Sequence, residues 1–345
     1  MGTTAGLRQA WVAVIALATA LSLLVGSDDS PAAAGETAPG QVVVAETVAS
    51  QTSTGPTDST DSTDSDLDAA PEPLPLPPVT TPPDFGLIAS RAGVRVKTHV
   101  VSEEYGNART LDVYTPRALR GRTGQATPTI VLVHGGGWVK GDRTDLEKQA
   151  VQLTQLGYVA VSVNYRLAQH GTADQQRADV EAAIAYVRKN ASRLNVDPKR
   201  MVLVGSSAGG QIAASVATAG TGPNRFRGLV TLSGLLDPFY MVGANPAYSS
   251  GVVPNLLLRC LPTECPDEYR AASALNQLDR TDPPSLLFHS AKEKSWGPEQ
   301  AEAFQRAAHR VGVDSHLVVL PGRKHGIALW NQVFPLLRDW LAQRL

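Results

Sequence analysis

The sequence predicts an α/β domain built on a mostly parallel central β-sheet that helices flank. Two observations carry this prediction: apolar runs without polar alternation, and amphipathic segments between them. A strand covered on both faces reads as a continuous apolar run. Strands that alternate with helices join through right-handed crossovers into a parallel sheet. The continuous runs are TIVLV (129–133), YVAVSV (158–163), MVLV (201–204), GLVTL (228–232), SLLF (285–288) and HLVVL (316–320).

The segments around these runs complete the predicted domain. Residues 95–101 and 109–116 alternate polar and apolar side chains, as paired strands do. Residues 173–194 and 297–312 are predicted helices, because their apolar positions recur every three or four residues. A long insert, about 235–284, precedes the penultimate strand. Segments of this length on a compact fold are commonly functional lids, so we expect it to be lid-like.

Length and charge limit the possible classes of protein. The chain has 345 residues, and 43% of them are hydrophobic, which is enough to bury a sizeable core. Its formal net charge is −1, from 31 basic and 32 acidic residues. Nucleic-acid-binding proteins carry a basic footprint that this balance does not supply. We therefore expect one domain with appendages and no nucleic-acid partner.

Residues 1–34 have the layout of a secretory signal. One basic residue, Arg8, precedes an apolar run at 11–25, and small residues follow as far as Ala34. The run is shorter than the roughly 20 residues that a membrane-spanning helix needs. We expect export with cleavage, which makes the protein secreted or associated with the cell envelope. An uncleaved helix would instead anchor the protein at a membrane.

Residues 35–84 are predicted to be a disordered linker. They contain the near-repeat TDSTDSTDSD and then PEPLPLPP, and this composition cannot bury apolar surface. The prolines stiffen the chain ahead of the folded domain, which is assigned to residues 85–345.

Cys260 and Cys265 are the two cysteines of the chain. In an exported protein, two cysteines this close in sequence are expected to form a short-loop disulfide. The alternative is a pair of free thiols in a reducing compartment. A metal site is not predicted, because no second Cys or His pair lies at ligand spacing.

The segment Gly205-Ser206-Ser207-Ala208-Gly209 fits the pattern G-x-S-x-G between a β-branched strand and a helix of small residues. This context is that of a nucleophile elbow, in which Ser207 lies on a strained turn with its hydroxyl exposed. The N–H of Ala208 then points toward the anion site at the helix start. A Gly/Ser-rich turn or a dinucleotide-binding loop is the alternative, but the G-x-G-x-x-G spacing is missing.

A second motif, His134-Gly135-Gly136-Gly137-Trp138, follows the run at 129–133. Consecutive glycines leave backbone N–H groups uncovered, and acyl transfer needs such donors for the developing oxyanion. We assign the N–H groups of Gly136, Gly137 and Ala208 to this oxyanion hole. His134 is expected to brace the loop, and Trp138 is a candidate pocket-lining side chain.

The same glycines have two alternative interpretations. Gly136 and Gly141 have the spacing of a phosphate loop, but Asp142 stands where that loop needs lysine and would repel phosphate. A purely structural glycine turn is the other alternative, and the G-x-S-x-G segment downstream argues against it.

Four motifs, in this order, resemble those of the α/β-hydrolase esterases and lipases: HGGGW (134–138), NYRLA (164–168), DVEAAIAYV (179–187) and GSSAGG (205–210). Within that fold they are similar to the hormone-sensitive-lipase-like and feruloyl-esterase-like groups. The likeness covers about residues 94–345 and implies an α/β-hydrolase fold without a metal or organic cofactor.

The chain departs from that pattern in two places. Ser206 replaces the aspartate of the common GDSAGG form, and Gln169-His170 follow YRLA in place of Pro-Glu. These departures leave the subfamily, and therefore the substrate, open.

The resemblance implies a catalytic base after the last strand and an acid before it, because the chain order in this fold is Ser, Asp or Glu, then His. The loop after the last strand, RKHGIALW, contains His325, which we assign as the base.

For the acid, relatives commonly run H-G-x-x-D after the penultimate strand. Here the segment is His289-Ser290-Ala291-Lys292-Glu293, and glutamate is an accepted variant. We assign Glu293, whose flanking lysines Lys292 and Lys294 are expected to stabilise the ionised carboxylate. The alternative acid is Asp237, after the preceding strand, although Asp-Pro at a strand end is more often a turn.

Together these assignments predict an exported serine hydrolase that cleaves a small-molecule carboxylic ester. An amide or formamide hydrolase of the arylformamidase-like kind could use the same residues. A catalytically silent α/β-hydrolase domain that serves as a binding module is the alternative from another class.

Overall fold

Our computed structural model describes residues 95–100, 110–119, 121–220, 225–244 and 251–345. The expected signal at 1–34, the linker at 35–84 and the start of the domain at 85 lie outside these described residues. In the described part, no helix is both long and apolar enough to cross a membrane.

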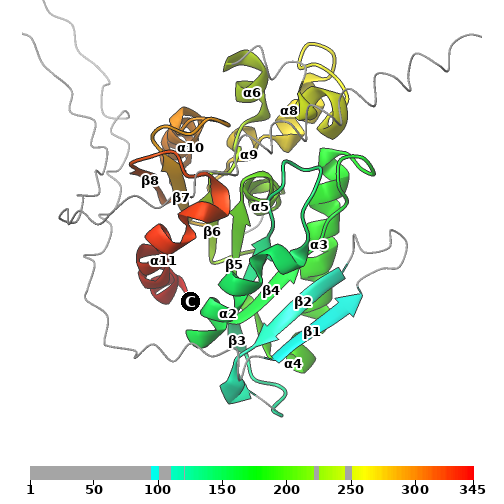
Figure 1. The fold of residues 1–345 in the computed structure, drawn as a ribbon, viewed down its shortest axis with the longest axis vertical. Coiled ribbons are helices and arrows are strands. Elements are labelled where there is room, and N and C mark those ends of the chain that lie inside the picture. Colours follow the sequence, from blue (N-terminus) through cyan, green and yellow to red (C-terminus); the bar gives the residue numbers. More distant parts are fainter. Residues whose placement is uncertain (1–94, 101–109, 120, 221–224, 245–250) are drawn as a thin grey trace, which may run out of the picture. The chain divides into compact units, whose positions relative to one another are not determined.

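One sheet organises the described residues (Figure 1). Its order is β1-β2-β4-β3-β5-β6-β7-β8, in which β1, β2 and β4 pair antiparallel and all later pairings are parallel. The predicted α/β fold with a mostly parallel sheet is therefore confirmed. The strands are β1 Arg95–Val100, β2 Thr110–Thr115, β3 Thr127–Val133, β4 Val159–Val163, β5 Val196–Ser206, β6 Gly228–Leu232, β7 Ser285–Ser290 and β8 Ser315–Leu320.

Helices cover both faces of this sheet. Their bounds are α2 Glu147–Gln155, α3 Ala173–Lys189, α4 Ala191–Leu194, α5 Ala208–Thr218, α6 Pro238–Ala244, α8 Pro266–Ala272, α9 Ala274–Gln277, α10 Glu299–Arg310 and α11 Trp330–Arg344. Shorter turns are η2 Arg117–Leu119, η3 Arg143–Leu146, the π-helical η4 Val253–Leu257 and η5 Gly326–Leu329.

The two faces explain why the strands are apolar at every position. In β3, Val131 and Val133 join a core with α3, α5 and α10. The alternate residues Ile130 and Leu132 join a second core with α2 and α11. Because successive side chains point to opposite faces, a sheet with two cores needs continuous apolar runs.

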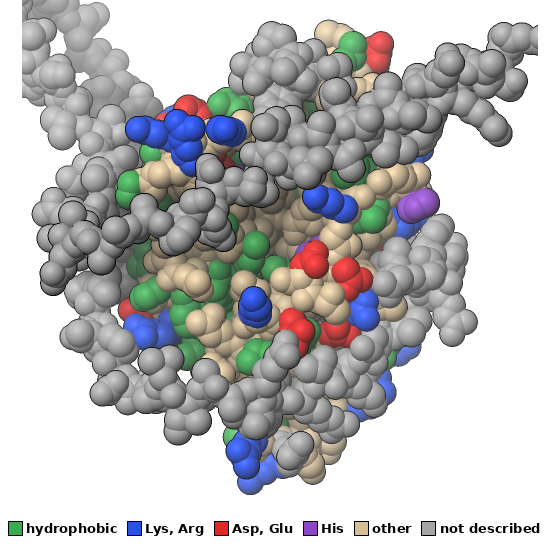
Figure 2. Space-filling view, viewed as in Figure 1, with side chains coloured by type: hydrophobic (Ala, Val, Ile, Leu, Met, Phe, Trp, Pro, Cys, Tyr) green, Lys and Arg blue, Asp and Glu red, His purple; other side chains and the backbone are tan. Residues whose placement is uncertain are grey.

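The insert before β7 contains α6, η4, α8 and α9, which gather at one end of the view in Figure 1, away from α2 and α4. Cys260 and Cys265 form a disulfide in this insert. Basic and acidic side chains are interspersed on the face that Figure 2 displays, in keeping with a net charge near zero.

One predicted helix differs from the structure. Residues 173–194 form two helices, because α3 ends before Asn190, whose backbone leaves the helical region at φ −104° and ψ 18°. The Asn190 side chain donates to Tyr186 O at 2.9 Å, the same carbonyl that accepts the Asn190 N–H at 3.0 Å.

A buried ion pair ties the segment after β4 to α3. Asp179 accepts Arg166 N–H, Nε–H and Nη2–H at 3.0, 2.7 and 2.9 Å. The side chains of Arg166 and Asp179 are 5% and 0% exposed. Breaking such a pair on one side leaves an uncompensated buried charge.

We predict that Asp179→Ala lowers the free energy of unfolding by about 3–5 kcal/mol, because Arg166 loses its buried carboxylate partner. Urea unfolding followed by circular dichroism measures this change. The matched control is Asp267→Ala, which removes the carboxylate of the solvent-exposed Arg270–Asp267 pair and should leave stability almost unchanged. Equal losses in the two variants would contradict the prediction.

Candidate active site

The turn between β5 and α5 carries Ser207 at φ 55° and ψ −120°, a strained conformation for a residue with a side chain. Its N–H donates to Leu232 O at 2.8 Å, which ties the turn to β6. A Cβ on Gly205 would lie 2.2 Å from Gly209 O, and one on Gly209 would lie 2.2 Å from His134 O. The glycines on each side of Ser207 are therefore required by close backbone contact.

His325 lies between Ser207 and Glu293. Its Nε2 is 2.8 Å from Ser207 Oγ, and its Nδ1 is 3.1 Å from Glu293 Oε2. The ring packs edge-on against Trp296, with 5.2 Å between centroids. The imidazole thus joins the serine on β5–α5 to the carboxylate after β7 in one hydrogen-bonded chain.

The Glu293 side chain is fully buried and surrounded by donors. Oε1 accepts Ser290 N–H at 3.0 Å and the hydroxyl of Ser233. His289 Nδ1 lies 3.7 Å from Oε2, too long for a good hydrogen bond. Burial alone would raise the pKa of Glu293, but interactions with His289, His325 and Ser233 outweigh it and lower the pKa to about 2. The carboxylate is therefore ionised at neutral pH.

Asp237, the alternative acid, lies in a different environment. Its Oδ1 accepts Ser273 Oγ–H at 3.0 Å and Phe239 N–H at 3.2 Å, and burial raises its pKa. Within the described ranges, no hydrogen bond joins it to His325. Asp237 instead caps the start of α6, which fits the Asp-Pro turn.

The HGGGW loop lies beside Ser207. A Cβ on Gly135 would lie 3.3 Å from Ser207 Cβ. Among the described residues, the N–H groups of Gly136, Gly137 and Ala208 donate no hydrogen bond to a protein acceptor. In the described part of the chain, no protein acceptor therefore competes for the three N–H groups that the sequence analysis assigned to the oxyanion hole.

His134 and Trp138 make contacts that hold the HGGGW loop in place. The buried ring of His134 stacks on Tyr165 with 4.3 Å between centroids, and His134 Nδ1 is 2.8 Å from Gly135 O. Burial lowers the pKa of His134, so it braces the loop as a neutral ring. Trp138 Nε1–H donates to Gln211 Oε1 at 3.0 Å, and its ring lies 5.9 Å from that of Trp296.

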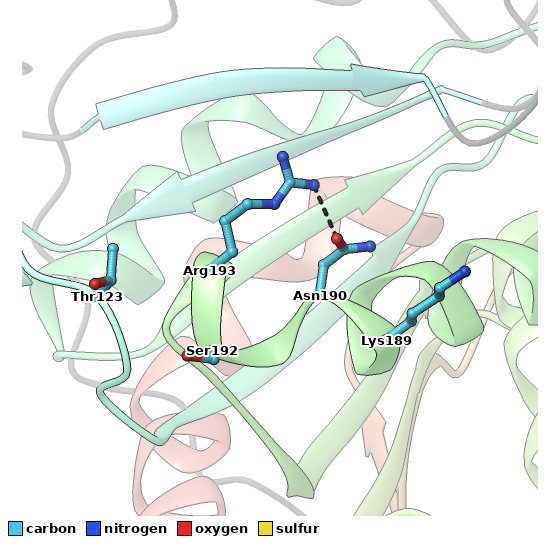
Figure 3. Close-up of a pocket in the computed structure, with 5 residues that line it drawn as sticks. All are labelled: Thr123, Lys189, Asn190, Ser192 and Arg193. Carbon is cyan, nitrogen blue, oxygen red and sulfur yellow. Dashed lines mark hydrogen bonds between the residues drawn. The ribbon is translucent and has the colours of Figure 1, made fainter.

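A surface hollow in the described residues lies away from these groups. Figure 3 shows its lining residues, Thr123, Lys189, Asn190, Ser192 and Arg193. They lie around α4, which precedes the amino end of β5, whereas Ser207 follows its carboxyl end. The hollow is therefore not part of the site around Ser207.

A model of the BD-FAE family matches residues 111–307, which is more than half of the chain. The chain belongs to the BD-FAE family. Together with the sheet described above, this membership confirms the resemblance to the α/β-hydrolases.

Several named relatives of this BD-FAE protein are esterases. Esterase LipC of Mycobacterium tuberculosis is 26% identical over 268 residues, which cover 73% of this chain and 64% of LipC. The isoprenylcysteine alpha-carbonyl methylesterase ICME of Arabidopsis thaliana is 26% identical, covering 62% of this chain and 53% of ICME. The chain thus spans between half and two thirds of these two curated relatives.

Among solved structures, a truncated carbohydrate esterase from gut microbiota is similar to this chain. Its TM-score is 0.64 at 20% identity, with coverage of 74% of this chain and 98% of that one. At this identity the likeness concerns the fold.

The structure adds site residues that the sequence analysis did not single out. Ser233 contacts Glu293, and Gln300 Nε2 lies 3.4 Å from His289 Nε2 and donates to Gly234 O at 3.0 Å. A signal for Ser233 was present: it follows β6 as Ser207 follows β5. Carboxyl ends of adjacent parallel strands meet at one edge of a sheet, where sites form.

The pKa of Glu293 generates a prediction for stability. Its folded value of about 2 is below the ordinary value of 4.5. A depressed carboxyl pKa contributes stability that is complete above pH 4.5 and is lost as pH falls toward 2. The difference in unfolding free energy between wild type and Glu293→Gln should therefore shrink as pH falls from 4.5 toward 2. Urea unfolding at a series of pH values measures this difference.

The matched control is Asp237→Asn. Burial raises the pKa of Asp237, so its ionised form opposes folding. The difference in unfolding free energy between wild type and Asp237→Asn should therefore grow, not shrink, as pH falls. A Glu293 difference that stays constant through the acid range would contradict the depressed pKa.

Proposed function

We propose that this protein is an exported serine hydrolase that cleaves carboxylic esters through Ser207, His325 and Glu293. The observation that carries the proposal is the unbroken chain Ser207 Oγ to His325 Nε2 and His325 Nδ1 to Glu293 Oε2, at 2.8 and 3.1 Å. A nucleophile, a base and an orienting acid in contact are what covalent acyl transfer requires.

In the first half-reaction, Ser207 Oγ bonds to the ester carbonyl carbon while its proton passes to His325 Nε2. The carbonyl electron pair moves onto oxygen, where the N–H groups of Gly136, Gly137 and Ala208 receive it. The carbon–oxygen bond to the alcohol then breaks, and His325 returns the proton to the alcohol oxygen. An acyl-enzyme on Ser207 remains.

Water completes the cycle by the same chemistry. It loses a proton to His325 Nε2 as its oxygen bonds to the acyl carbon, and the second tetrahedral species releases the carboxylic acid as Ser207 regains its proton. Glu293 stays ionised and offsets the imidazolium charge in both halves. The low pKa of Glu293 supports this role, since the carboxylate keeps its charge throughout.

The names of the relatives support an ester as the reacting group but do not agree on the rest of the substrate. LipC is named as an esterase, ICME as a methylesterase and the gut protein as a carbohydrate esterase. The shared element is the carboxylic ester. Export is proposed from residues 1–34, whose charge, apolar run and small residues have the order of a secretory signal.

We expect purified protein to hydrolyse a short p-nitrophenyl ester much faster than an N-formyl aryl amine, and Ser207→Ala to abolish both. A fluorophosphonate should form an adduct at Ser207, located by peptide mass spectrometry. A faster formamide reaction would favour the amidase alternative. Folded wild type that forms no adduct would favour a catalytically silent binding module.

The acid assignment has its own test. Glu293→Gln should lower kcat by about 10³-fold or more, because the amide no longer offsets the imidazolium charge and can favour the wrong tautomer. Asp237→Asn is the matched control and should stay within about twofold of wild type. Steady-state kinetics on p-nitrophenyl acetate measures both values of kcat. A large loss of kcat in Asp237→Asn would show that the acid is Asp237.

A further inference from the structure

Ser233 lies at the carboxyl end of β6, next to the turn that carries Ser207. Its residue is completely buried, and its φ of 51° is in the left-handed region that side-chain-bearing residues rarely adopt. Conformations of this kind persist where the surrounding structure enforces them, and they gather at functional sites.

The hydroxyl of Ser233 connects the acid to the base loop. It donates to Glu293 Oε1 and accepts Gly326 N–H at 2.9 Å. Gly326 directly follows His325, so a single oxygen contacts both the carboxylate and the backbone beside the imidazole.

The backbone of Ser233 is bound on both sides as well. Its N–H donates to Phe288 O at 2.8 Å, and its carbonyl accepts Trp296 Nε1–H at 2.9 Å. These two bonds hold Ser233 against β7 and against the aromatic ring that packs on His325. The backbone of Ser233 is therefore held by the strand and the loop, independently of Glu293.

We propose that Ser233 is a positioning residue that holds Glu293 in the orientation from which it serves His325. The inference rests on the proposed function and extends it to a residue outside the Ser–His–Glu chain. Glutamate has one more rotatable bond than aspartate and so has more orientations to exclude. Ser233 and Ser290 N–H occupy Oε1, which leaves Oε2 directed at His325 Nδ1.

A structural role alone would make a different prediction. If the hydroxyl only satisfied buried polar groups, its removal would destabilise the fold and lower activity by the same factor whether or not Glu293 is present. If it positions the carboxylate, the loss of activity depends on that carboxylate. A double-mutant cycle separates the two explanations.

The test compares Ser233→Ala, Glu293→Ala and the double variant, by steady-state kinetics on p-nitrophenyl acetate and by the rate of fluorophosphonate labelling at Ser207. Ser233→Ala should lower kcat by about tenfold or more, the size expected for one hydrogen bond to a charged group, with KM nearly unchanged. In the Glu293→Ala background the same change should have no further effect. An equal loss in both backgrounds would overturn the proposal.

Two variants control for backbone and burial. Ser233→Gly also lacks the hydroxyl but relieves the φ of 51°, so it should lose as much activity as Ser233→Ala. Ser285→Ala removes a buried hydroxyl that bonds to Ser315 Oγ at the far end of β7, and it should keep wild-type kcat. A Ser233→Gly variant with wild-type kcat would overturn the proposal.

Histidine ¹⁵N NMR keeps this test independent of the proposed function. The Nδ1–H resonance of His325 reports its hydrogen bond to Glu293 in folded protein, with or without turnover. Ser233→Ala should move that resonance, and an unchanged resonance would overturn the positioning role. Wild type that cleaves no ester and forms no adduct would instead overturn the proposed function alone.

Discussion

The HGGGW loop, the glycine loop that follows β3, approaches the turn at Ser207 closely, and the rest of the site depends on this constraint. A Cβ on Gly135 would lie 2.9 Å from Ser206 O, and one on Gly209 would lie 2.2 Å from His134 O. Side chains at these places would force the two backbones apart. Because they are absent, the backbone at Gly135 lies beside Ser207, at the start of the glycine loop whose N–H groups are proposed to form the oxyanion hole.

Hydrogen bonds and one ion pair join three of the four motifs, HGGGW, NYRLA and DVEAAIAYV, although they lie far apart in the sequence. The Trp138 carbonyl accepts Ala168 N–H at 2.8 Å and Gln176 Nε2–H at 3.3 Å. Arg166, two residues before Ala168, is held by Asp179 on the same helix as Gln176. The glycine loop, the NYRLA segment and α3 thus form one supported unit. Asp179 bears on the site through this support, without touching a reacting group.

The sequence was sufficient to predict features set by local pattern and chain order. The apolar runs predicted the strands because each covered strand must be apolar on both faces. Ser207 was assigned from its G-x-S-x-G context, and Glu293 and His325 from the chain order Ser, acid, His that the resemblance implies. They follow β5, β7 and β8, parallel strands whose carboxyl ends lie at one edge of the sheet. The break at Asn190 was missed, since the apolar period continues through it while the Asn190 backbone leaves the helical region.

The remaining contacts could not be predicted, because they join residues far apart in the chain. Ser233 and Gly326 are separated by 93 positions, and Trp138 and Gln211 by 73. No periodicity or motif encodes which of several strand-end serines reaches a carboxylate. The choice between Glu293 and Asp237 depended on the same kind of distance, and Asp237 bonds instead to Ser273.

Burial decides which neighbouring charges affect the ionisation of Glu293. The sequence Lys292-Glu293-Lys294 suggested that lysines stabilise the carboxylate, but both lysine side chains are exposed while that of Glu293 is fully buried. Water screens exposed charges, so they stabilise a buried ion weakly. The pKa of Glu293 is governed by burial and by His289, His325 and Ser233. The proposed acid is therefore held ionised from within the fold. Ser233, one of the groups that lower its pKa, is also the residue proposed to orient it.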